Sequence, residues 1–193
     1  MDERQWIHAI QKGNKKYLQD IAEKYYDDIY RFCAFQTGSR TDACDLAQET
    51  FLRFIKYVES YHDRNLKGYL LTIAMNVCRN YFCQKDKEPE TSLDEEKENA
   101  HAEEFQGQFP DRPKRSEPEQ YAIEADVYDR LMEALMQLPQ IQREAILLHY
   151  LQDMKYREIS HMKGISVSTA KSRVRQGMEK LQTILRREDF FEG

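Results

Sequence analysis

The sequence predicts an all-α protein with two small helical domains joined by a flexible acidic linker, the C-terminal domain being a helix-turn-helix. Apolar residues recur three and four positions apart in both halves of the chain, as they do along one face of a helix. Neither half shows the alternating apolar and polar pattern of a strand. Between the halves, prolines and glutamates replace the aliphatic residues that a core needs. We therefore place the domains at 1–85 and 121–193, and the linker at 86–120.

Turn signals divide the start of the first domain into two helices. We expect a helix near residues 3–12 and, after a turn at Gly13, a second helix from about 15 to 35. Gly38 closes this second helix, since glycine readily adopts the left-handed conformation that ends many helices.

The third helix is predicted to start after Thr41 as its N-cap and to run to about Val58. Its apolar face repeats at intervals of four, four, three and four residues and comprises Ala43, Ala47, Phe51, Phe54 and Val58. Away from this face, Asp45, Gln48 and Glu49 form one acidic polar patch. Taken alone, such a patch is most simply a solvated helix surface.

A fourth helix is expected over 66–84, after a polar loop at 59–65. The residues expected to be buried are Leu70, Ile73, Ala74, Val77 and Tyr81. A second, polar stripe follows the same spacing on another side, about a third of a turn away. This stripe consists of Asn76, Arg79, Asn80 and Cys83.

The second domain ends in the strongest local signal of the chain. We expect helices over 121–138 and 140–151, with Pro139 in the first turn of the latter. A short helix over 154–163, a turn at Gly164 and a helix capped by Ser166 then form a helix-turn-helix. Its packing residues are predicted to be Ile159, Met162, Ile165, Val167, Ala170, Val174, Met178, Leu181 and Leu185.

Charge on this unit favours a DNA partner, although the whole chain of 193 residues has a net charge of −5. Residues 155–187 hold nine Lys or Arg against two Glu, whereas residues 86–119 hold five basic against twelve acidic residues. Arg175 and Lys171 can bond guanine or phosphate, and Gln176 can address adenine. Ser168 and Ser172 add short hydrogen bonds. The segment at 155–187 is thus predicted to bind duplex DNA.

No pattern in the sequence proposes a catalytic, metal or cofactor site. Phosphate-binding loops, nucleophile elbows and paired metal-binding histidines are missing. The cysteines form no C-x-x-C pair, and Cys78 and Cys83 are expected on different helix faces. The N-terminus lacks the blocks of a signal peptide, and no apolar run reaches the length of a membrane span. We expect a cytoplasmic protein that is not an enzyme, with no cofactor and no small-molecule substrate.

Four motifs together resemble a known family, the extracytoplasmic-function sigma factors, which are the smallest sigma subunits of bacterial RNA polymerase. They are D-L-A-Q-E-T-F at 45–51, L-L-T-I-A-M-N-V-C-R-N-Y-F at 70–82, L-P-Q-I-Q-R-E-A-I-L-L at 138–148, and Y-R-E-I-S with S-T-A-K-S-R at 156–160 and 168–173. The resemblance spans nearly the whole chain. Two positions depart from the pattern, since Ser160 stands where the family usually has Ala, and Ala170 where Val or Ile is common.

The resemblance implies a role for each polar surface. The patch of Asp45, Gln48 and Glu49 corresponds to the surface that docks on the β′ clamp helices of core polymerase. The stripe of Asn76, Arg79 and Asn80, with the loop before it, corresponds to the reader of the single-stranded −10 element. The basic helix, with Ser168, Lys171, Ser172, Arg173, Arg175 and Gln176, corresponds to the reader of the −35 duplex. The β flap, promoter DNA and an anti-sigma factor are the further partners that the resemblance implies.

Two other functions remain open at this point. One is a stand-alone helix-turn-helix regulator that does not join polymerase, and the other is an adaptor or anti-repressor that acts only through proteins. We expect the free protein to be monomeric. Association with core polymerase separates the main prediction from the first alternative, and DNA binding separates it from the second.

Overall fold

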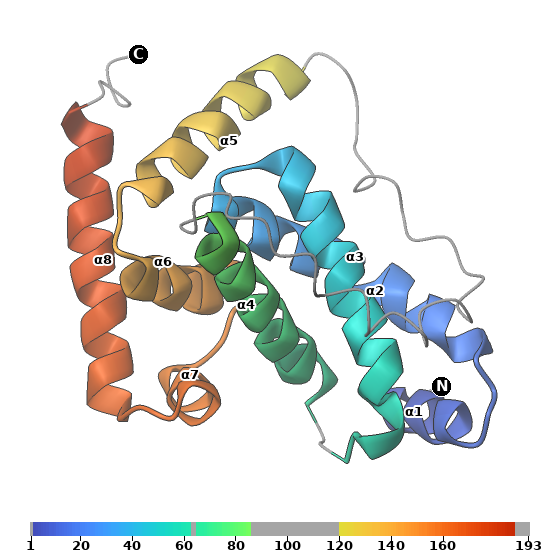
Figure 1. The fold of residues 1–193 in the computed structure, drawn as a ribbon. Helices are drawn as coiled ribbons and strands as arrows, with labels where there is room; N and C mark the ends of the chain where they lie inside the picture. Colours follow the sequence, from blue (N-terminus) through green and yellow to red (C-terminus); the bar gives the residue numbers. More distant parts are fainter. Residues whose placement is uncertain (1, 63–64, 86–119, 188–193) are drawn as a thin grey trace. The chain divides into compact units, whose positions relative to one another are not determined.

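The computed structural model describes residues 2–62, 65–85 and 120–187, and these residues form helices and no strands. The predicted all-α class is therefore confirmed. The chain divides into two compact units, one built mainly on the helices before residue 86 and the other mainly on those after residue 119 (Figure 1). Nearly all of the predicted linker and the last six residues lie outside the described residues. Within the described part, no helix is long and apolar enough to cross a membrane.

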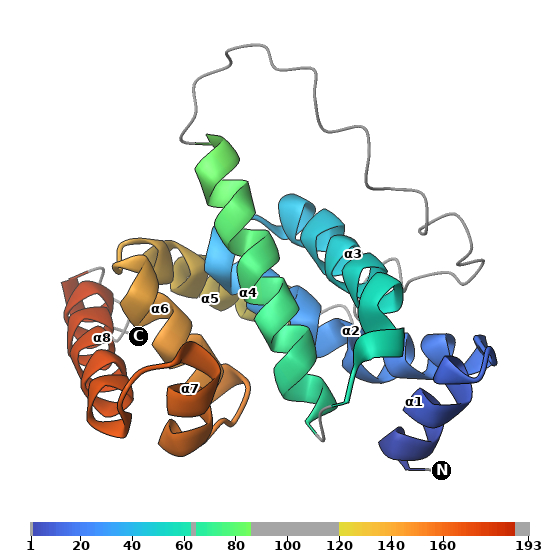
Figure 2. The same cartoon turned by 60° about the horizontal axis from the view of Figure 1, so that its bottom comes forward.

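The first unit is a helical bundle whose core is rich in aromatic residues. Tyr26 stacks on Phe51 with ring centroids 6.0 Å apart, and Phe54 meets Tyr69 edge-on at 6.3 Å. These contacts join the second helix to the third and the third to the fourth. Figure 2 shows the ribbons of these three helices. The elements are α1 (Glu3–Gln11), α2 (Lys16–Thr37), α3 (Arg40–Tyr57), the 3-10 turn η1 (Val58–Ser60) and α4 (Leu66–Lys85).

The α3 helix confirms the predicted apolar face but not the predicted cap. All five residues of that face are buried. The helix starts at Arg40, however, and the Ser39 hydroxyl accepts the hydrogen bond from the Asp42 N–H at 3.2 Å. Ser39 therefore caps the helix, and Thr41 lies inside its first turn. Ser39 and Thr41 lie two positions apart and are both suitable N-cap residues, so only the backbone path selects between them.

The α4 helix is buried more broadly than its single predicted stripe. Leu70, Ala74 and Val77 are buried as expected, whereas Ile73 and Tyr81 are only half-buried. Further residues complete the buried surface, namely Leu66, Gly68, Leu71, Met75 and Cys78. A helix packed against neighbours on two sides shows no clean amphipathic stripe. The apolar spacing therefore predicted only some of the buried residues of α4.

The second unit contains α5 (Gln120–Met136), α6 (Gln140–Ile146), the π-helical turn η3 (Leu147–Leu151), α7 (Tyr156–Lys163) and α8 (Val167–Arg187). Its core side chains include Leu135, Leu138, Leu148, Ile159 and Val174. The buried Arg143 guanidinium reaches the carbonyl oxygens of Leu135 and Met136 at 3.5 and 3.4 Å. Arg143 thereby satisfies acceptors that the end of α5 leaves open.

Three predicted boundaries in this unit are wrong. Pro139 precedes α6 as its N-cap residue, with φ −54° and ψ 137°, and is not in the first turn. The helix expected over 140–151 changes to a π-helical turn at Leu147. The short helix begins at Tyr156, because Asp153 takes a left-handed φ of 54° and interrupts the helical path before it.

Candidate nucleic-acid and polymerase interfaces

The turn between α7 and α8 is fixed by hydrogen bonds on both sides. Gly164 ends α7 with a φ of 61°, and the Ser166 hydroxyl accepts the Thr169 N–H at 3.0 Å. Both predictions, the turn glycine and the serine cap, are confirmed. The Ser160 hydroxyl also donates to the Ile165 carbonyl oxygen at 2.5 Å, while the Ile165 N–H donates to the Ser160 carbonyl at 3.1 Å. The serine that departs from the family pattern thus closes the turn.

The α8 helix packs on α6 through a very close approach at Gly177. A Cβ built on this glycine would lie 2.8 Å from Ile146 Cδ1 and 3.1 Å from Gln142 Cβ. The predicted packing residues Ala170, Val174 and Leu181 are buried, and Met178 and Leu185 are half-buried. Val167 is 43% exposed, so its predicted burial is wrong. Val167 is the first residue of α8, and at this end of the helix no neighbouring element in the described part of the chain covers the position that the apolar spacing predicted to be buried.

Five of the residues predicted to read duplex DNA share the outer face of α8, and the sixth, Arg173, lies off this face. Ser168, Lys171, Arg175 and Gln176 are exposed, whereas Ser172 and Arg173 are half-buried. Positions three, four and seven apart lie above one another on a helix, so this face is continuous over two turns. The Arg175 guanidinium is 3.9 Å from the Glu179 carboxylate, and Gln176 accepts a 3.5 Å hydrogen bond from Gln142. Both contacts are long, which leaves these groups able to exchange partners.

The polar stripe of α4 is exposed, as predicted. Asn76, Arg79 and Asn80 all lie on the solvent side, and Cys83 continues their line. The Arg79 guanidinium donates to the Asn76 side-chain oxygen at 3.4 Å, which leaves the Asn76 amide N–H groups directed elsewhere. Since the neighbouring residues Met75, Val77 and Cys78 are buried, the stripe rests on a packed support.

The acidic patch also forms one surface, on α3. Asp45 is exposed, and Gln48 and Glu49 are half-buried. The Glu49 carboxylate accepts a hydrogen bond from Arg53, one turn further along, at 2.5 Å. Glu49 therefore presents itself together with a cation, which the sequence interpretation did not include. Because Arg53 is paired with Glu49, the net negative charge of the patch is lower than its sequence indicates.

The free cysteines differ sharply in environment. Cys78 is buried and Cys83 is exposed, which confirms that they lie on different faces. Cys33 is buried beside Cys78, and a hydrogen bond with Cys78 together with burial raises the pKa of the Cys33 thiol. This neighbouring pair was not predicted, since it joins α2 to α4 across a large sequence separation.

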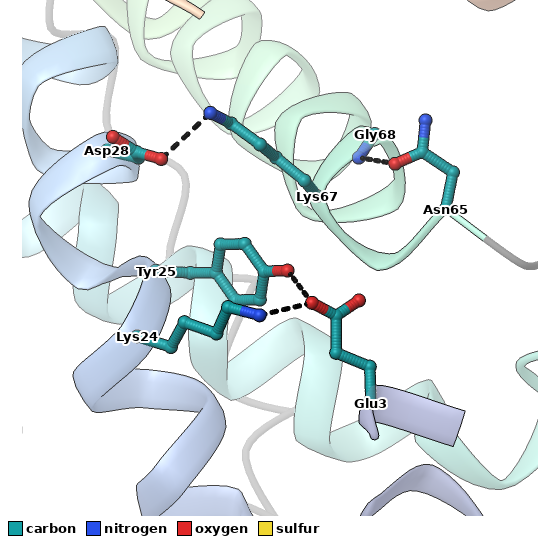
Figure 3. Close-up of polar contacts among 7 residues, drawn as sticks. All are labelled: Glu3, Lys24, Tyr25, Asp28, Asn65, Lys67 and Gly68. Carbon is teal, nitrogen blue, oxygen red and sulfur yellow. Dashed lines mark hydrogen bonds and ion pairs between the residues drawn. The ribbon is translucent and has the colours of Figure 1, made fainter. Parts of the chain in front are cut away.

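A set of polar contacts that the sequence did not reveal ties α1 and α4 to α2 (Figure 3). The Glu3 carboxylate accepts hydrogen bonds from Lys24 and Tyr25, and Lys67 pairs with Asp28 at 2.9 Å. Burial and the hydrogen bond to Glu3 raise the pKa of Tyr25 well above its usual range. No pattern of spacing predicts such partners, because they lie on different helices.

Sequence and structure comparisons agree on one family. Residues 21–88 match Sigma-70 region 2, and residues 128–181 match Sigma-70, region 4. The chain is 28% identical to the ECF RNA polymerase sigma factor SigW of Bacillus subtilis, over 93% of this chain and 95% of SigW. It is 31% identical to the ECF RNA polymerase sigma factor EcfG of Rhodopseudomonas palustris, over 87% of this chain and 84% of EcfG.

Solved structures share the fold. CnrH, solved in complex with the cytosolic domain of CnrY, aligns with a TM-score of 0.69 at 17% identity, over 97% of this chain and 99% of that one. The sigma factor RpoE of Bartonella quintana, solved with the anti-sigma factor NepR, aligns with a TM-score of 0.62 at 24% identity, over 87% and 98%. The chain therefore belongs to the extracytoplasmic-function sigma factors of the sigma-70 family and is an RNA polymerase sigma factor.

Proposed function

We propose that the chain divides promoter recognition and polymerase binding among its three polar surfaces. The α8 face reads duplex DNA at −35, the α4 stripe reads the single-stranded −10 element, and the α3 patch docks on core polymerase. The corresponding domains are 1–85 and 121–193, joined by the linker at 86–120. Core polymerase carries out the chemistry, and the chain supplies specificity.

The α8 face carries this proposal furthest. Its exposed side chains combine cations for phosphate with Arg and Gln groups for base edges, and the packed side of the same helix holds them in register. The half-buried Arg173 is suited to a backbone phosphate, since its head group has less freedom to enter a groove. We assign base contacts to Arg175 and Gln176, and positioning contacts to Ser168, Lys171 and Ser172.

The α4 stripe suits unpaired bases. The Asn76 amide offers a donor and an acceptor to a base edge, and Arg79 can stack on a base or bind the strand. Because Arg79 already bonds Asn76, the two side chains act as one unit. Asn80 extends this unit by one residue.

The α3 patch suits a basic partner surface. Asp45 is the freest carboxylate of the three residues, and Glu49 must exchange or share Arg53 when it meets polymerase. We assign Asp45, Gln48 and Glu49 to the β′ clamp helices. The second unit would contact the β flap. An anti-sigma factor would be a further partner, as the sigma factor RpoE is in complex with the anti-sigma factor NepR. We place the protein in the cytoplasm, where polymerase works.

Run-off transcription with core polymerase on the promoter beside the protein's own gene tests the proposal. Initiation should require this chain. Gln48→Ala with Glu49→Ala should weaken core binding and spare binding to −35 duplex, and Arg175→Ala should do the reverse. DNA binding without any association with polymerase would instead favour a stand-alone regulator.

Matched variants make the division sharper. Gln19→Ala with Glu23→Ala removes another Gln and Glu from the first unit and should leave core binding unchanged. Lys180→Ala removes an exposed cation from the same helix as Arg175 and should change −35 affinity much less. Arg53→Ala separates the two uses of Glu49: if it weakens core binding as the double variant does, Glu49 acts by holding Arg53 rather than by touching polymerase.

A further inference from the structure

The connection between α3 and α4 is held at its start by a side chain from α1. The Gln11 side-chain amide reaches the carbonyl oxygens of Val58, Glu59 and Tyr61 at 3.2, 3.4 and 2.8 Å. These carbonyls follow the last turn of α3, where backbone acceptors run out of helical partners. Since an amide nitrogen carries two hydrogens, Gln11 shares them among three acceptors, and the Tyr61 carbonyl is the nearest.

Gln11 itself is held in place by the rest of α1. Ile7 and Ile10 are buried, and α1 packs against η1. Glu3 at the other end of the helix accepts hydrogen bonds from Lys24 and Tyr25 of α2 (Figure 3). The amide of Gln11 therefore comes from a fixed support rather than from a mobile surface helix.

The far side of the same connection is fixed from α2. The Asn65 side chain caps α4 by accepting the Gly68 N–H at 2.9 Å, and Lys67 pairs with Asp28 at 2.9 Å. The Tyr61 ring is buried against Tyr69 with centroids 4.8 Å apart. Residues 58–61 and the start of α4 are thus held together, with His62 and Asn65 exposed between them.

We propose that Gln11 is a positioning residue for recognition of the −10 strand. By donating to the backbone at 58–61, Gln11 holds Tyr61, whose ring packs on Tyr69 of α4, the helix of the Asn76 stripe. Helix α1 lies before the segment that matches Sigma-70 region 2, which begins at residue 21. This inference rests on the proposed role of α4, and it adds α1 to the same reader.

The direction of donation makes the inference testable. Gln11→Glu keeps the size of the side chain but can only accept, so it would face three carbonyl oxygens without a proton to offer. Gln11→Lys can donate three hydrogen bonds. Gln5→Ala is the matched control, since Gln5 lies on the same helix and accepts a hydrogen bond from the Asp2 N–H rather than donating to residues 58–61.

The assay uses holoenzyme reconstituted from core polymerase and the full chain. The probes are a single-stranded oligonucleotide with the −10 element of the chain's own promoter and the same oligonucleotide with those bases scrambled. The ratio of the two affinities is the readout, because it cancels the effect of a changed charge on general binding. Circular dichroism checks that each variant folds. If Gln11→Ala is unstable, the affinity ratios of Gln11→Glu and Gln11→Lys can still be compared with each other.

Gln11→Ala and Gln11→Glu should lower this ratio by ~5-fold or more, the change expected from a neutral hydrogen bond. Gln11→Lys and Gln5→Ala should retain most of the wild-type affinity ratio. In all of these variants, the affinity for −35 duplex and for core polymerase should not change. The inference is overturned if the wild type discriminates and Gln11→Glu does so equally, or if Gln5→Ala loses as much. If the wild-type holoenzyme does not discriminate at all, the proposed −10 role fails as well.

Discussion

The Lys163 ammonium at the end of α7 donates a hydrogen bond to the buried carboxylate of Glu144 on α6. Their side chains are 17% and 7% exposed, so the pair is largely removed from water. It joins the first helix of the helix-turn-helix to the helix beneath it. A buried pair is costly to form, yet breaking it by removing one partner leaves an uncompensated charge.

We predict that Lys163→Met destabilises the protein by ~3–5 kcal/mol, the cost of stranding a buried carboxylate. Adding Glu144→Leu should restore most of this loss, because the remaining groups are then all apolar. Urea unfolding of the two single variants and the double variant measures the coupling. Additive losses in the three variants would show that the two side chains do not interact.

Gly177→Ala should destabilise the packing of α8 on α6. The new methyl group would meet Ile146 Cδ1 at 2.8 Å, and overpacking of this kind costs ~1–3 kcal/mol. Because alanine is a better helix former, it regains up to ~1 kcal/mol of stability. The net loss of stability should therefore be smaller than the cost of overpacking alone. Ile146→Val removes the clashing carbon, and the double variant should be more stable than Gly177→Ala alone by thermal unfolding. A double variant no better than the single one would place the strain at Gln142 instead.

Ser160→Ala should cost ~1 kcal/mol, because the Ile165 carbonyl loses the hydroxyl that donates to it. The turn before α8 should loosen, and the affinity for −35 duplex should fall with it. Thr183→Ala is the control, since its hydroxyl donates to the Glu179 carbonyl within its own helix and lies away from the turn. Hydrogen exchange at the Ile165 and Ser166 amides reports the loosening, and equal protection in wild type and Ser160→Ala would contradict it.

The first unit should lose stability in acid through Glu3. Burial raises the pKa of this carboxyl, but hydrogen bonds from Lys24 and Tyr25 and the charge of Lys24 outweigh it, so the pKa lies below its ordinary value. The folded state thus binds a proton less readily than the unfolded state, and the stabilisation is present above about pH 4.3 and is lost as pH falls through the folded pKa. Unfolding followed from pH 7 down to about pH 2 should show a smaller drop for Glu3→Gln than for wild type. An identical drop would mean that other carboxylates carry the effect.

Local chemistry let the sequence predict most of the fold. The face of α3, the Gly164 turn and the Ser166 cap depend on residues within one turn of each other, and all are confirmed. Family resemblance then suggested the proposed roles of surfaces whose spacing and charge alone indicated none. The Asp45 patch is the clearest case, since its spacing alone indicates only a solvated surface.

Tertiary contacts explain what the sequence missed. Ile73 is as apolar as Leu71, yet only the position of neighbouring helices decides which of them is buried. Gln11 is an ordinary surface residue until the backbone at 58–61 is placed beside it. The change to a π-helical turn at Leu147 likewise depends on how α6 meets the rest of its unit, which no local pattern encodes.

The contact at Gly177 also constrains how this protein can evolve. While position 146 carries Ile and the α6 backbone is undisturbed, glycine fits best opposite it, since a methyl group at 177 would lie 2.8 Å from Ile146 Cδ1. Shortening residue 146 first would make enlargement of residue 177 less costly, so one order of the two substitutions is favoured over the other. Among descendants of this chain, a side chain at 177 should therefore coincide more often with a smaller residue at 146.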